Sequence, residues 1–538
     1  LPSKTIKQDS AKKLTESGTV ITMHKKRTVS IINFIRYDEP RLVVDLFEPV
    51  REQMKLSIKY DLPTTWLMQV DAILAGPYPE FFKANMPKNH ELGLWLEINR
   101  MHCDYAGVKY RGRDGVNWDH HSQAALTIGY SVGDRIKLAD AAMEIFKEKF
   151  TCYPESVAAW YIDAVTLAHL YDKYGIKASA NCRDQWGTDG YSLWGGVWAG
   201  GYYPSRKNAM IPGSCCQSQI KVPVFRMLGS CPINQYDCAI GENGQEVFTL
   251  EPAYNQNRKW VEKLFANMFD EVPFDYSFVQ AGQENSFGWT RMRESYQIQM
   301  LLINEYRNDN RISVTLLKDA GEWYQKQYSL TTPVGVIASQ DPTDKERQAF
   351  WYNSRYYRVG FVREDMSMKI RDLHLFTDEY ESRYLNSQCN SAAMTVDALP
   401  IVEGFLWQKY FKNACLNIEL FCNGKWREAR FDKVETDCDN ETMRLKLYSK
   451  SGACVWELRE DKIKCTFPIA IEWRLRMPFP AFAGCQIKDS KIEFAHNGFK
   501  YNIKISEIST VIEIDNHIIL SPQKHCITFE LHPQYQET

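Results

Sequence analysis

Acidic and aromatic side chains alternate along residues 90–98, which read HELGLWLEI. In an extended strand Glu91, Trp95 and Glu97 share one face, while the leucines share the other. The apolar face can pack beneath helices, but two carboxylates beside an indole are costly to bury unless they are paired or take part in chemistry. We therefore expect Trp95 and Glu97 to line a site. A structural ion pair between Glu97 and the nearby Arg100 is the alternative.

Other carboxylates stand where apolar runs end. Asp38, Asp163 and Glu284 each follow a strand-like run by only a few residues. When parallel strands alternate with helices, the C-terminal ends of the strands meet at one edge, and the chemistry of such folds lies there. We expect Asp38 to serve function. Asp163 and Glu284 also precede predicted helices, so capping of free N–H groups is an equally simple reason for both.

A glycine-rich loop at residues 184–213 is crowded with aromatic side chains. Loops this long are uncommon unless they are functional or disordered, and the aromatic content argues against disorder. Aromatic rings stack on the faces of sugars, so we expect this loop to form the walls of a carbohydrate site, with packing against a second domain as the alternative. Its rings belong to Trp186, Tyr191, Trp194, Trp198, Tyr202 and Tyr203.

The elements that position these residues alternate between strands and amphipathic helices over residues 1–330, of which 1–27 are a lead-in. This alternation implies a parallel sheet of the α/β class, and about seven or eight units imply a distorted (β/α) barrel. From residue 331 the pattern changes to short strands and turns, with a hairpin across 496–498. We therefore expect a barrel domain at 1–330 and an all-β sandwich domain at 331–538.

Composition narrows the class of protein. A chain of 538 residues is too long for one hydrophobic core, which favours two domains. The formal net charge of −2 gives no bulk attraction to nucleic acid, and no apolar run approaches the roughly 20 residues that cross a bilayer. The 15 cysteines include no CxxC pair and show no regular disulfide spacing. The chain begins at Leu1, which fits a removed leader or a chosen boundary, so the compartment stays open.

The order of these parts resembles the polysaccharide deacetylase superfamily and the wider group of seven-stranded barrels that includes glycoside hydrolase families 38 and 57. Residues 59–66, KYDLPTTW, resemble the start of strand two in that group, which reads KYGxPATF. Residues 90–93, HELG, resemble the HEIG that opens the metal motif of the deacetylases. Residues 38–40, DEP, stand where those proteins carry DDGP. The resemblance covers residues 29–330.

The metal motif of the deacetylases is interrupted in this sequence. Their two metal-binding histidines, four residues apart, correspond to Trp95 and Asn99, and their strand-four motif RxP is replaced by WYID at 160–163. Neither an indole nor a carboxamide replaces imidazole, and loss of two ligands from a three-ligand site should abolish the metal that activates water.

The resemblance instead favours a glycosidase. Glycosidases of this barrel class place a carboxylate nucleophile at the end of strand four and a carboxylic acid near the end of strand seven, and Asp163 and Glu284 fall at those two ends. Two carboxyls whose pKa values are pushed apart supply both roles, and retention is the first choice of outcome. Segments 182–191 and 283–289 resemble signatures of an uncharacterised bacterial glycosidase-like family. The predicted substrate-binding residues are Asp38, Trp95, Glu97, Trp160, Asp184, Trp186, Asp189, Tyr191, Trp194 and Gln283.

Two alternatives remain. A metal-dependent carbohydrate deacetylase would draw its ligands from Asp38, His90 and either His120 or His121. A glycan-binding protein on a barrel scaffold would bind without turnover. In every case the expected partner is an oligosaccharide or polysaccharide. The sequence indicates no cofactor and leaves a divalent metal, the identity of the sugar and the oligomeric state open.

Overall fold

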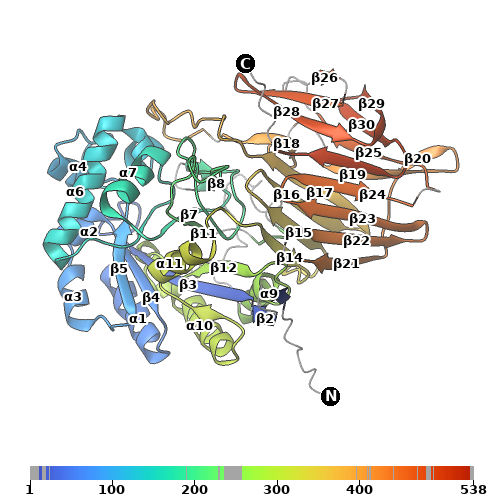
Figure 1. The fold of residues 1–538 in the computed structure, drawn as a ribbon. Coiled ribbons are helices and arrows are strands. Elements are labelled where there is room, and N and C mark those ends of the chain that lie inside the picture. The colour runs from blue at the N-terminus through green and yellow to red at the C-terminus, as the bar shows by residue number, and fades with distance from the viewer. Residues whose placement is uncertain are drawn as a thin grey trace.

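A computed structural model shows two halves that lie side by side (Figure 1). The structure describes residues 11–14, 20–23, 25–188, 191–227, 231–234, 252, 257–395, 397–408, 410, 414–439, 441–468, 471–479, 486–488 and 490–532.

A curved parallel sheet forms the centre of the N-terminal half. Its strands are the apolar runs of the sequence, and their side chains are buried on both faces, as expected for a parallel sheet covered by helices. The strand order is β12 (Tyr276–Ala281), β3 (Lys26–Ile35), β4 (Thr64–Met68), β5 (His90–Trp95) and β6 (Val157–Ala158), with β13 (Ser313–Val314) also paired to β3.

A second, smaller sheet continues the curve. In it β7 (Ser179–Cys182) runs parallel to β11 (Val224–Met227), which also pairs with β10 (Gly201–Tyr202). A parallel bridge between Ser156 and Ala178 joins β6 to β7, and β11 lies beside β12. The short strands β8 (Gln185–Thr188) and β9 (Tyr191–Leu193) pair with each other, as do β1 (Ala11–Leu14) and β2 (Val20–Met23).

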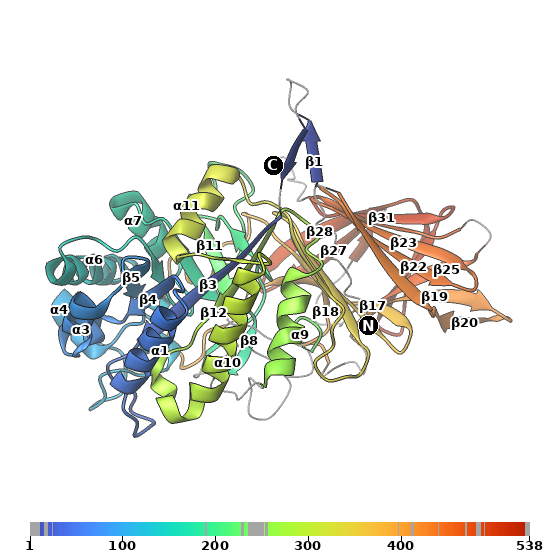
Figure 2. The ribbon, with the colours of Figure 1, turned by 90° about the horizontal axis from the view of Figure 1, so that it is seen from below.

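Helices cover the outside of this half (Figures 1 and 2). They pack their apolar stripes on the sheet and turn polar residues to solvent, as in α1. Among the described helices, none combines the length and apolar character that crossing a membrane requires. The helices are α1 (Phe47–Lys59), α2 (Val70–Leu74), α3 (Tyr78–Asn85), α4 (Arg100–Ala106), α5 (Ser122–Ala125), η1 (Thr127–Gly129), α6 (Val132–Phe150), α7 (Ala164–Tyr174), α9 (Arg258–Phe269), η3 (Asn285–Phe287), α10 (Trp289–Asn308) and α11 (Leu317–Gln327).

Two large antiparallel sheets form the C-terminal half. Side chains alternate along their strands, so that in β22 (Met443–Ser449) Met443, Leu445 and Leu447 are buried while Arg444 and Lys446 are not. One hydrophobic core contains side chains from both sheets, which therefore pack face to face.

The first of these sheets has the order β14-β15-β16-β17-β19-β25-β30-β29, with β18 on β17 and β20 on β19. The second has the order β21-β22-β23-β24-β31-β28-β27-β26. Their bounds are β14 (Val334–Ala338), β15 (Gln348–Asn353), β16 (Tyr357–Glu364), β17 (Ser367–Leu375), β18 (Leu399–Glu403), β19 (Leu416–Cys422), β20 (Lys425–Glu428), β21 (Lys433–Cys438), β23 (Gly452–Arg459), β24 (Lys462–Thr466), β25 (Trp473–Pro478), β26 (Gln486–Lys488), β27 (Lys491–His496), β28 (Phe499–Ser506), β29 (Ile508–Ile514), β30 (His517–Pro522) and β31 (Cys526–Glu530).

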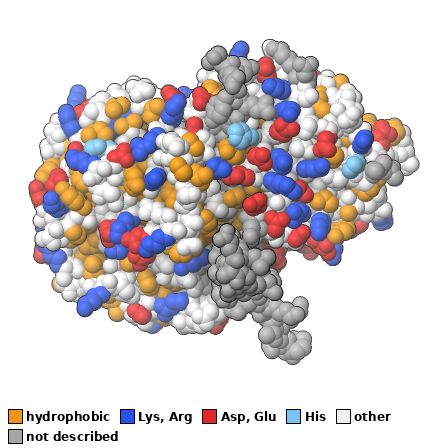
Figure 3. All heavy atoms as spheres, in the orientation of Figure 1, with side chains coloured by type: hydrophobic (Ala, Val, Ile, Leu, Met, Phe, Trp, Pro, Cys, Tyr) orange, Lys and Arg blue, Asp and Glu red, His pale blue; other side chains and the backbone are white. Residues whose placement is uncertain are grey.

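The mixed α/β class predicted from the sequence is confirmed, and the parallel sheet precedes the antiparallel sheets as expected. Closure of the parallel strands into a complete barrel is not confirmed, because they divide into the two sheets described above. The division into domains at residue 331 stays a prediction. Acidic and basic side chains are interspersed over the face shown in Figure 3, in keeping with the net charge of −2.

Candidate functional site

Charged and polar side chains from four strand ends gather at Arg36. Arg36 follows β3, Gln69 follows β4, Glu97 follows β5 and Glu284 follows β12. These four strands are neighbours in one parallel sheet, so their C-terminal ends meet at one edge. All four side chains are buried. We call this set the Arg36 cluster.

Three carboxylates surround the Arg36 guanidinium. Its Nη2 and Nε donate to Glu97 Oε2 at 3.0 and 3.3 Å. Its Nη1 lies 3.2 Å from Glu284 Oε2 and 3.5 Å from Glu39 Oε2. One buried cation therefore holds together the loops that follow β3, β5 and β12.

Aromatic residues complete the surroundings of Glu97 and Arg36. Trp95 Nε1 donates to Glu97 Oε2 at 2.7 Å, and Gln69 Nε2 donates to the same oxygen at 2.9 Å. The Arg36 guanidinium carbon lies 4.1 Å from the centre of the Trp118 ring. Trp118 is fully buried and comes from the insertion between α4 and α5, so this insertion covers the cluster.

Two carboxyls with raised pKa values stand beside the Arg36 cluster. Asp38 follows β3 and is half-buried, whereas Asp71 follows β4 and is fully buried. Burial raises the pKa of Asp71 to about 7, and the negative charge of Asp38 adds to the rise. Burial also raises the pKa of Asp38, against hydrogen bonds from the Trp118 and Asn117 backbones. Asn117 Nδ2 also donates to Asp71 Oδ2 at 2.7 Å, so the insertion contacts both acids.

Several predicted residues thus lie in or beside one cluster. Glu97 and Glu284 belong to it, Trp95 donates a hydrogen bond to Glu97, and Trp160 lies 5.3 Å from Trp95 by ring centres. Gln283 comes from the same strand end, where its backbone accepts a hydrogen bond from Gln53 Nε2 at 2.9 Å. Roles in catalysis or sugar binding for these residues stay predictions.

Asp163 lies at a helix start, as the capping alternative expected. It is the N-cap of α7 and accepts hydrogen bonds from the backbone N–H groups of Val165 and Thr166 at 3.1 and 3.2 Å. Thr127 Oγ1 donates to its Oδ2 at 2.6 Å, and Arg135 Nη1 lies 3.2 Å from its Oδ1. These contacts account for a buried carboxylate without catalysis, and its role as nucleophile stays a prediction.

We expect the substitution Asp163→Asn to lower the free energy of unfolding by about 1.5–3 kcal/mol. The buried Arg135 loses the negative charge of its partner, while an amide oxygen in the place of Oδ1 still caps α7. Urea unfolding would measure the change. Asp172→Asn on the same helix is the matched control, because its ion pair with Arg206 is exposed. Unchanged stability with lost turnover would instead favour Asp163 as nucleophile.

The aromatic loop packs largely against the C-terminal half. Trp194 Nε1 donates to Glu403 Oε2 at 2.9 Å, and the Trp198 ring stacks on Trp351 with ring centres 4.3 Å apart. Asp184 Oδ2 lies 2.9 Å from Arg358 Nη1. The packing alternative therefore describes Asp184, Trp194 and Trp198 better than sugar walls do.

For the remaining predicted residues of this loop, the structure describes the backbone at most. Asp189 lies outside the described residues, and Trp186 and Tyr191 are placed as members of β8 and β9 by their backbones only.

The ligand set of the deacetylase alternative is not brought together. Asn99 Oδ1 accepts from His102 N at 3.0 Å and caps α4. His90 stands at the start of β5, whereas Asp38 follows the end of β3 in the same parallel sheet. The two residues therefore lie at opposite edges of the sheet. His90 Nδ1 lies 3.1 Å from Trp66 Nε1, and burial lowers the pKa of His90 to about 4. The residues at the strand ends do not fit the metal that the resemblance implies.

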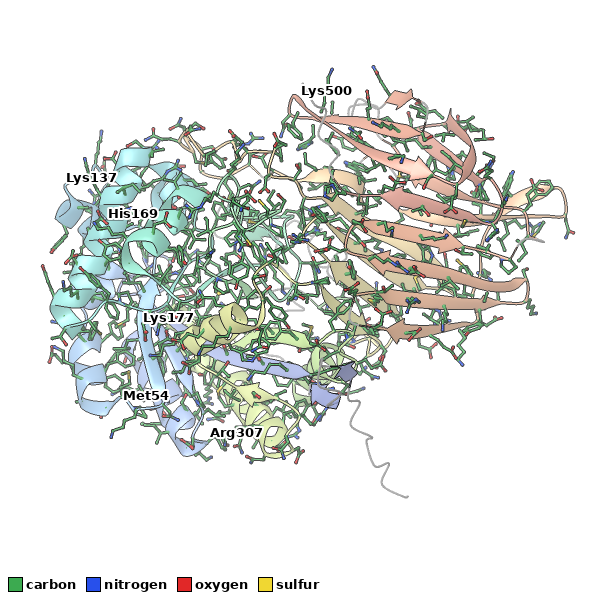
Figure 4. All side chains as sticks on the ribbon, in the orientation of Figure 1. Met54, Lys137, His169, Lys177, Arg307 and Lys500 are labelled. Atoms are coloured by element: carbon green, nitrogen blue, oxygen red, sulfur yellow. The ribbon has the colours of Figure 1, made fainter. Side chains whose placement is uncertain are left out.

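Another group of metal-ligand type lies on β17 and β18, where Glu403 accepts a hydrogen bond from Trp194 of the N-terminal half. Side chains fill the space between the two halves (Figure 4). The group's members Asp372, His374 and Glu403 are buried, and His374 Nε2 lies 2.7 Å from Glu403 Oε2. Arg358 Nε and Nη2 donate to the two oxygens of Asp372 at 2.9 and 2.6 Å. A guanidinium that occupies both oxygens repels a divalent cation, so this set fits an ion-paired junction better than a metal centre.

Four residues that define the site were not predicted from the sequence: Arg36, Gln69, Asp71 and Trp118. The signal for two of them was present, because Gln69 and Asp71 follow the apolar run 64–68 as Asp38 follows the strand before it. The same strand-end rule would have found them.

Comparisons with known proteins support the fold alone. No family model matches the sequence, and no curated protein is similar to it. The fold is similar to that of a candidate glycoside hydrolase/deacetylase from Parabacteroides distasonis, with a TM-score of 0.52 and 13% identity over 72% of this chain and 98% of that one. A candidate polysaccharide deacetylase from Mycobacterium smegmatis matches at a TM-score of 0.36 and 11% identity, over 56% of this chain and 91% of that one. An allantoinase matches at 0.35 and 13%, over 60% and 100%.

The likeness to the candidate glycoside hydrolase/deacetylase, at 13% identity, shows the fold and no more. The narrower likeness to glycoside hydrolase families 38 and 57 is not confirmed.

Proposed function

We propose that the protein is a hydrolase that removes an acyl group from a carbohydrate, with Asp38 and Asp71 moving the protons. One observation carries this proposal. Two carboxyls from the ends of adjacent strands both have raised pKa values, and that of Asp71 is about 7, where a group can accept and return a proton at neutral pH.

The placement of these carboxyls favours acyl removal over glycosidic cleavage. Glycosidases need two carboxyls on opposite sides of the scissile bond, about 5–9.5 Å apart. Asp38 and Asp71 follow neighbouring strands and approach from one side. Of the two acids first assigned to glycosidic cleavage, Asp163 caps α7 and Glu284 is ion-paired with Arg36. Deacylation of a sugar amide or ester therefore becomes the preferred reading, ahead of the glycosidase expected from the sequence.

In the proposed mechanism Asp38 accepts a proton from water as the water oxygen attacks the acyl carbon, since Asp38 is the less buried of the two acids. The bond from the acyl carbon to the sugar nitrogen or oxygen then breaks, and the proton passes to that leaving atom. Asp71 supports the transfer as the second carboxyl of the pair. Arg36 is a positioning residue, because its charge opposes the rise in the pKa of Asp71 and its contacts fix Glu97.

No step in this mechanism passes through a metal. Trp95 and Asn99, which stand at the histidine positions of the deacetylases, are already engaged by Glu97 and by the start of α4. The proposal accordingly differs from the metal-dependent deacetylase considered as an alternative.

The proposal is tested by incubating the protein with N-acetylated and O-acetylated oligosaccharides and measuring released acetate and new reducing ends. We expect acetate without new reducing ends, and we expect the rate to survive treatment with a chelator because the strand ends lack the metal-ligand set. New reducing ends without acetate would restore the glycosidase reading. Acetate release that stops on chelation and returns with zinc would restore the metal-dependent one.

A further inference from the structure

Arg226 is a buried arginine that leaves one edge of its guanidinium unused. It lies on β11, is 2% exposed, and its Nε and Nη2 make no hydrogen bond in the described part of the chain. Its Nη1 lies 3.7 Å from Met210 Sδ, a weak acceptor. An unsatisfied buried donor destabilises the folded state, and more so when it is charged, so the folded protein retains this arrangement at the expense of stability.

A second, partly buried guanidinium lies close by. Arg183 follows β7, the neighbour of β11, and its guanidinium carbon lies 4.7 Å from the centre of the Trp198 ring. Burial lowers the pKa of Arg183 to about 10, and the positive charge of Arg226 adds to the fall. The two cations therefore repel each other, and a negative charge between them would be stabilised.

The nearby carboxylate of Asp184 is already engaged. Its Oδ2 is ion-paired with Arg358 Nη1 at 2.9 Å, and its Oδ1 accepts from Gly195 N at 2.8 Å. Tyr202 also lies beside Arg226. The charge of Arg226, and a side-chain hydrogen bond with it, oppose the rise that burial causes in the pKa of Tyr202. The hydroxyl of Tyr202 donates to Ala209 O at 2.6 Å. Neither neighbour provides two oxygens to the free edge of Arg226.

Another arginine of this protein, Arg358, uses the same two nitrogen atoms to bind a carboxylate. Arg358 uses its Nε and Nη2 to hold the two oxygens of Asp372 at 2.9 and 2.6 Å. The spacing of these two N–H donors matches the spacing of two oxygens in a carboxylate, a sulfate or a phosphate. Arg226 presents the equivalent atoms without a partner.

The position of Arg226 connects this edge to the candidate site. Arg226 is near the C-terminal end of β11, and β11 lies beside β12, whose C-terminal end leads to Glu284. Both places are therefore on the edge of the parallel strands where substrates bind in folds of this kind.

We infer that Arg226, supported by Arg183, is a subsite for an anionic group on the substrate, and that the substrate is an acidic sugar whose carboxylate binds the free edge of Arg226. This inference rests on the proposed function for the sugar, but the anion subsite is tested by binding and does not depend on turnover.

The test compares Arg226→Met with the matched variant Arg358→Met. Both remove a buried guanidinium and keep a long apolar side chain, but Arg358 is fully paired. Isothermal titration with glucuronate, glucose, sulfate and phosphate at constant ionic strength would measure binding, and thermal unfolding without ligand would measure stability. We expect saturable binding of glucuronate but not of glucose, at least a tenfold weaker affinity in Arg226→Met, and a melting temperature in that variant no lower than in the wild type.

Each other outcome overturns part or all of the inference. Equal glucuronate affinity in wild type and Arg226→Met removes Arg226 from the subsite. A melting temperature that falls in Arg226→Met as far as in Arg358→Met makes Arg226 a structural residue. Tight binding of sulfate or phosphate without glucuronate contradicts the carboxylate and assigns a sulfated or phosphorylated sugar. Asp38→Asn should bind glucuronate as the wild type does, which separates failure of this inference from failure of the proposed reaction.

Discussion

Replacement of Asp38 by Asn is expected to lower kcat/KM for acyl release by about 10²–10⁴-fold, the usual contribution of a positioned general base. Asparagine keeps the shape of the side chain and one acceptor oxygen but cannot take a proton from water. Steady-state acetate release measures the effect, and glucuronate affinity serves as the folding control. Activity within a factor of about three of the wild type would remove Asp38 from the reaction, because loss of a base has a far larger effect.

The pH profile adds an independent check through Asp71. In the wild type kcat/KM should rise with pH through about 7, because the carboxyl pair must lose a proton before it can accept one. In Asp71→Asn the break near this pH should disappear.

The same substitution should alter stability with a defined sign. The pKa of Asp71 is raised on folding, so its stability contribution is present below the unfolded value of about 3.9 and is lost as the pH rises through about 7. Asp71→Asn should therefore flatten the fall in stability between these pH values, and an unchanged pH profile would contradict the assignment.

The fold class could be predicted because the apolar runs of the first half are true buried strands. Residues 29–35 are mostly apolar, and residues 90–98 place apolar side chains at every second position. Both runs contribute a strand of the parallel sheet, although the second strand ends at Trp95. The boundaries were less predictable. Residues 59–66 resemble the start of strand two, but β4 begins only at Thr64, because α1 continues to Lys59 and Leu62 N then bonds back to Ser57 O. Closure of the sheet depends on contacts between distant strands, which local periodicity does not report.

The site was predictable only where position alone identified function. The strand-end rule brought forward Asp38 and Glu284, and the alternation along residues 90–98 brought forward Glu97. The structure places all three in or beside the Arg36 cluster. For Asp163 the rule leaves two roles open, because an acid before a helix satisfies a cap and a strand end equally well. The cap is present and Arg135 pairs with the carboxylate, while the catalytic role stays a prediction. Arg36 was missed because a buried arginine is recognisable only once its three acidic neighbours, which come from separate loops, are known.

Replacement of Arg358 by Met is expected to lower the free energy of unfolding by about 3–5 kcal/mol, the usual cost of removing one partner from a buried ion pair. Arg358 is fully buried and binds Asp372 through two nitrogens and Asp184 through the third. Its loss leaves two carboxylates buried without their cation. These contacts join the loop after β7 to strands β16 and β17, so the substitution should destabilise both halves. Urea unfolding followed by fluorescence and by circular dichroism would measure it.

The reason for this large effect is burial, which a matched control can isolate. Arg206→Met also removes a guanidinium that lies near both oxygens of an acid, here Asp172 at 3.0 and 3.1 Å, but this pair is largely exposed. Its loss should change stability by no more than about 1 kcal/mol, because solvent already screens the pair. If the two variants lost equal stability, the junction at Arg358 would be open to water. A double variant, Arg358→Met with Asp372→Leu, should recover part of the lost stability, because it removes one of the two unpaired buried carboxylates. Asp184 would remain buried without its cation, so recovery should be incomplete.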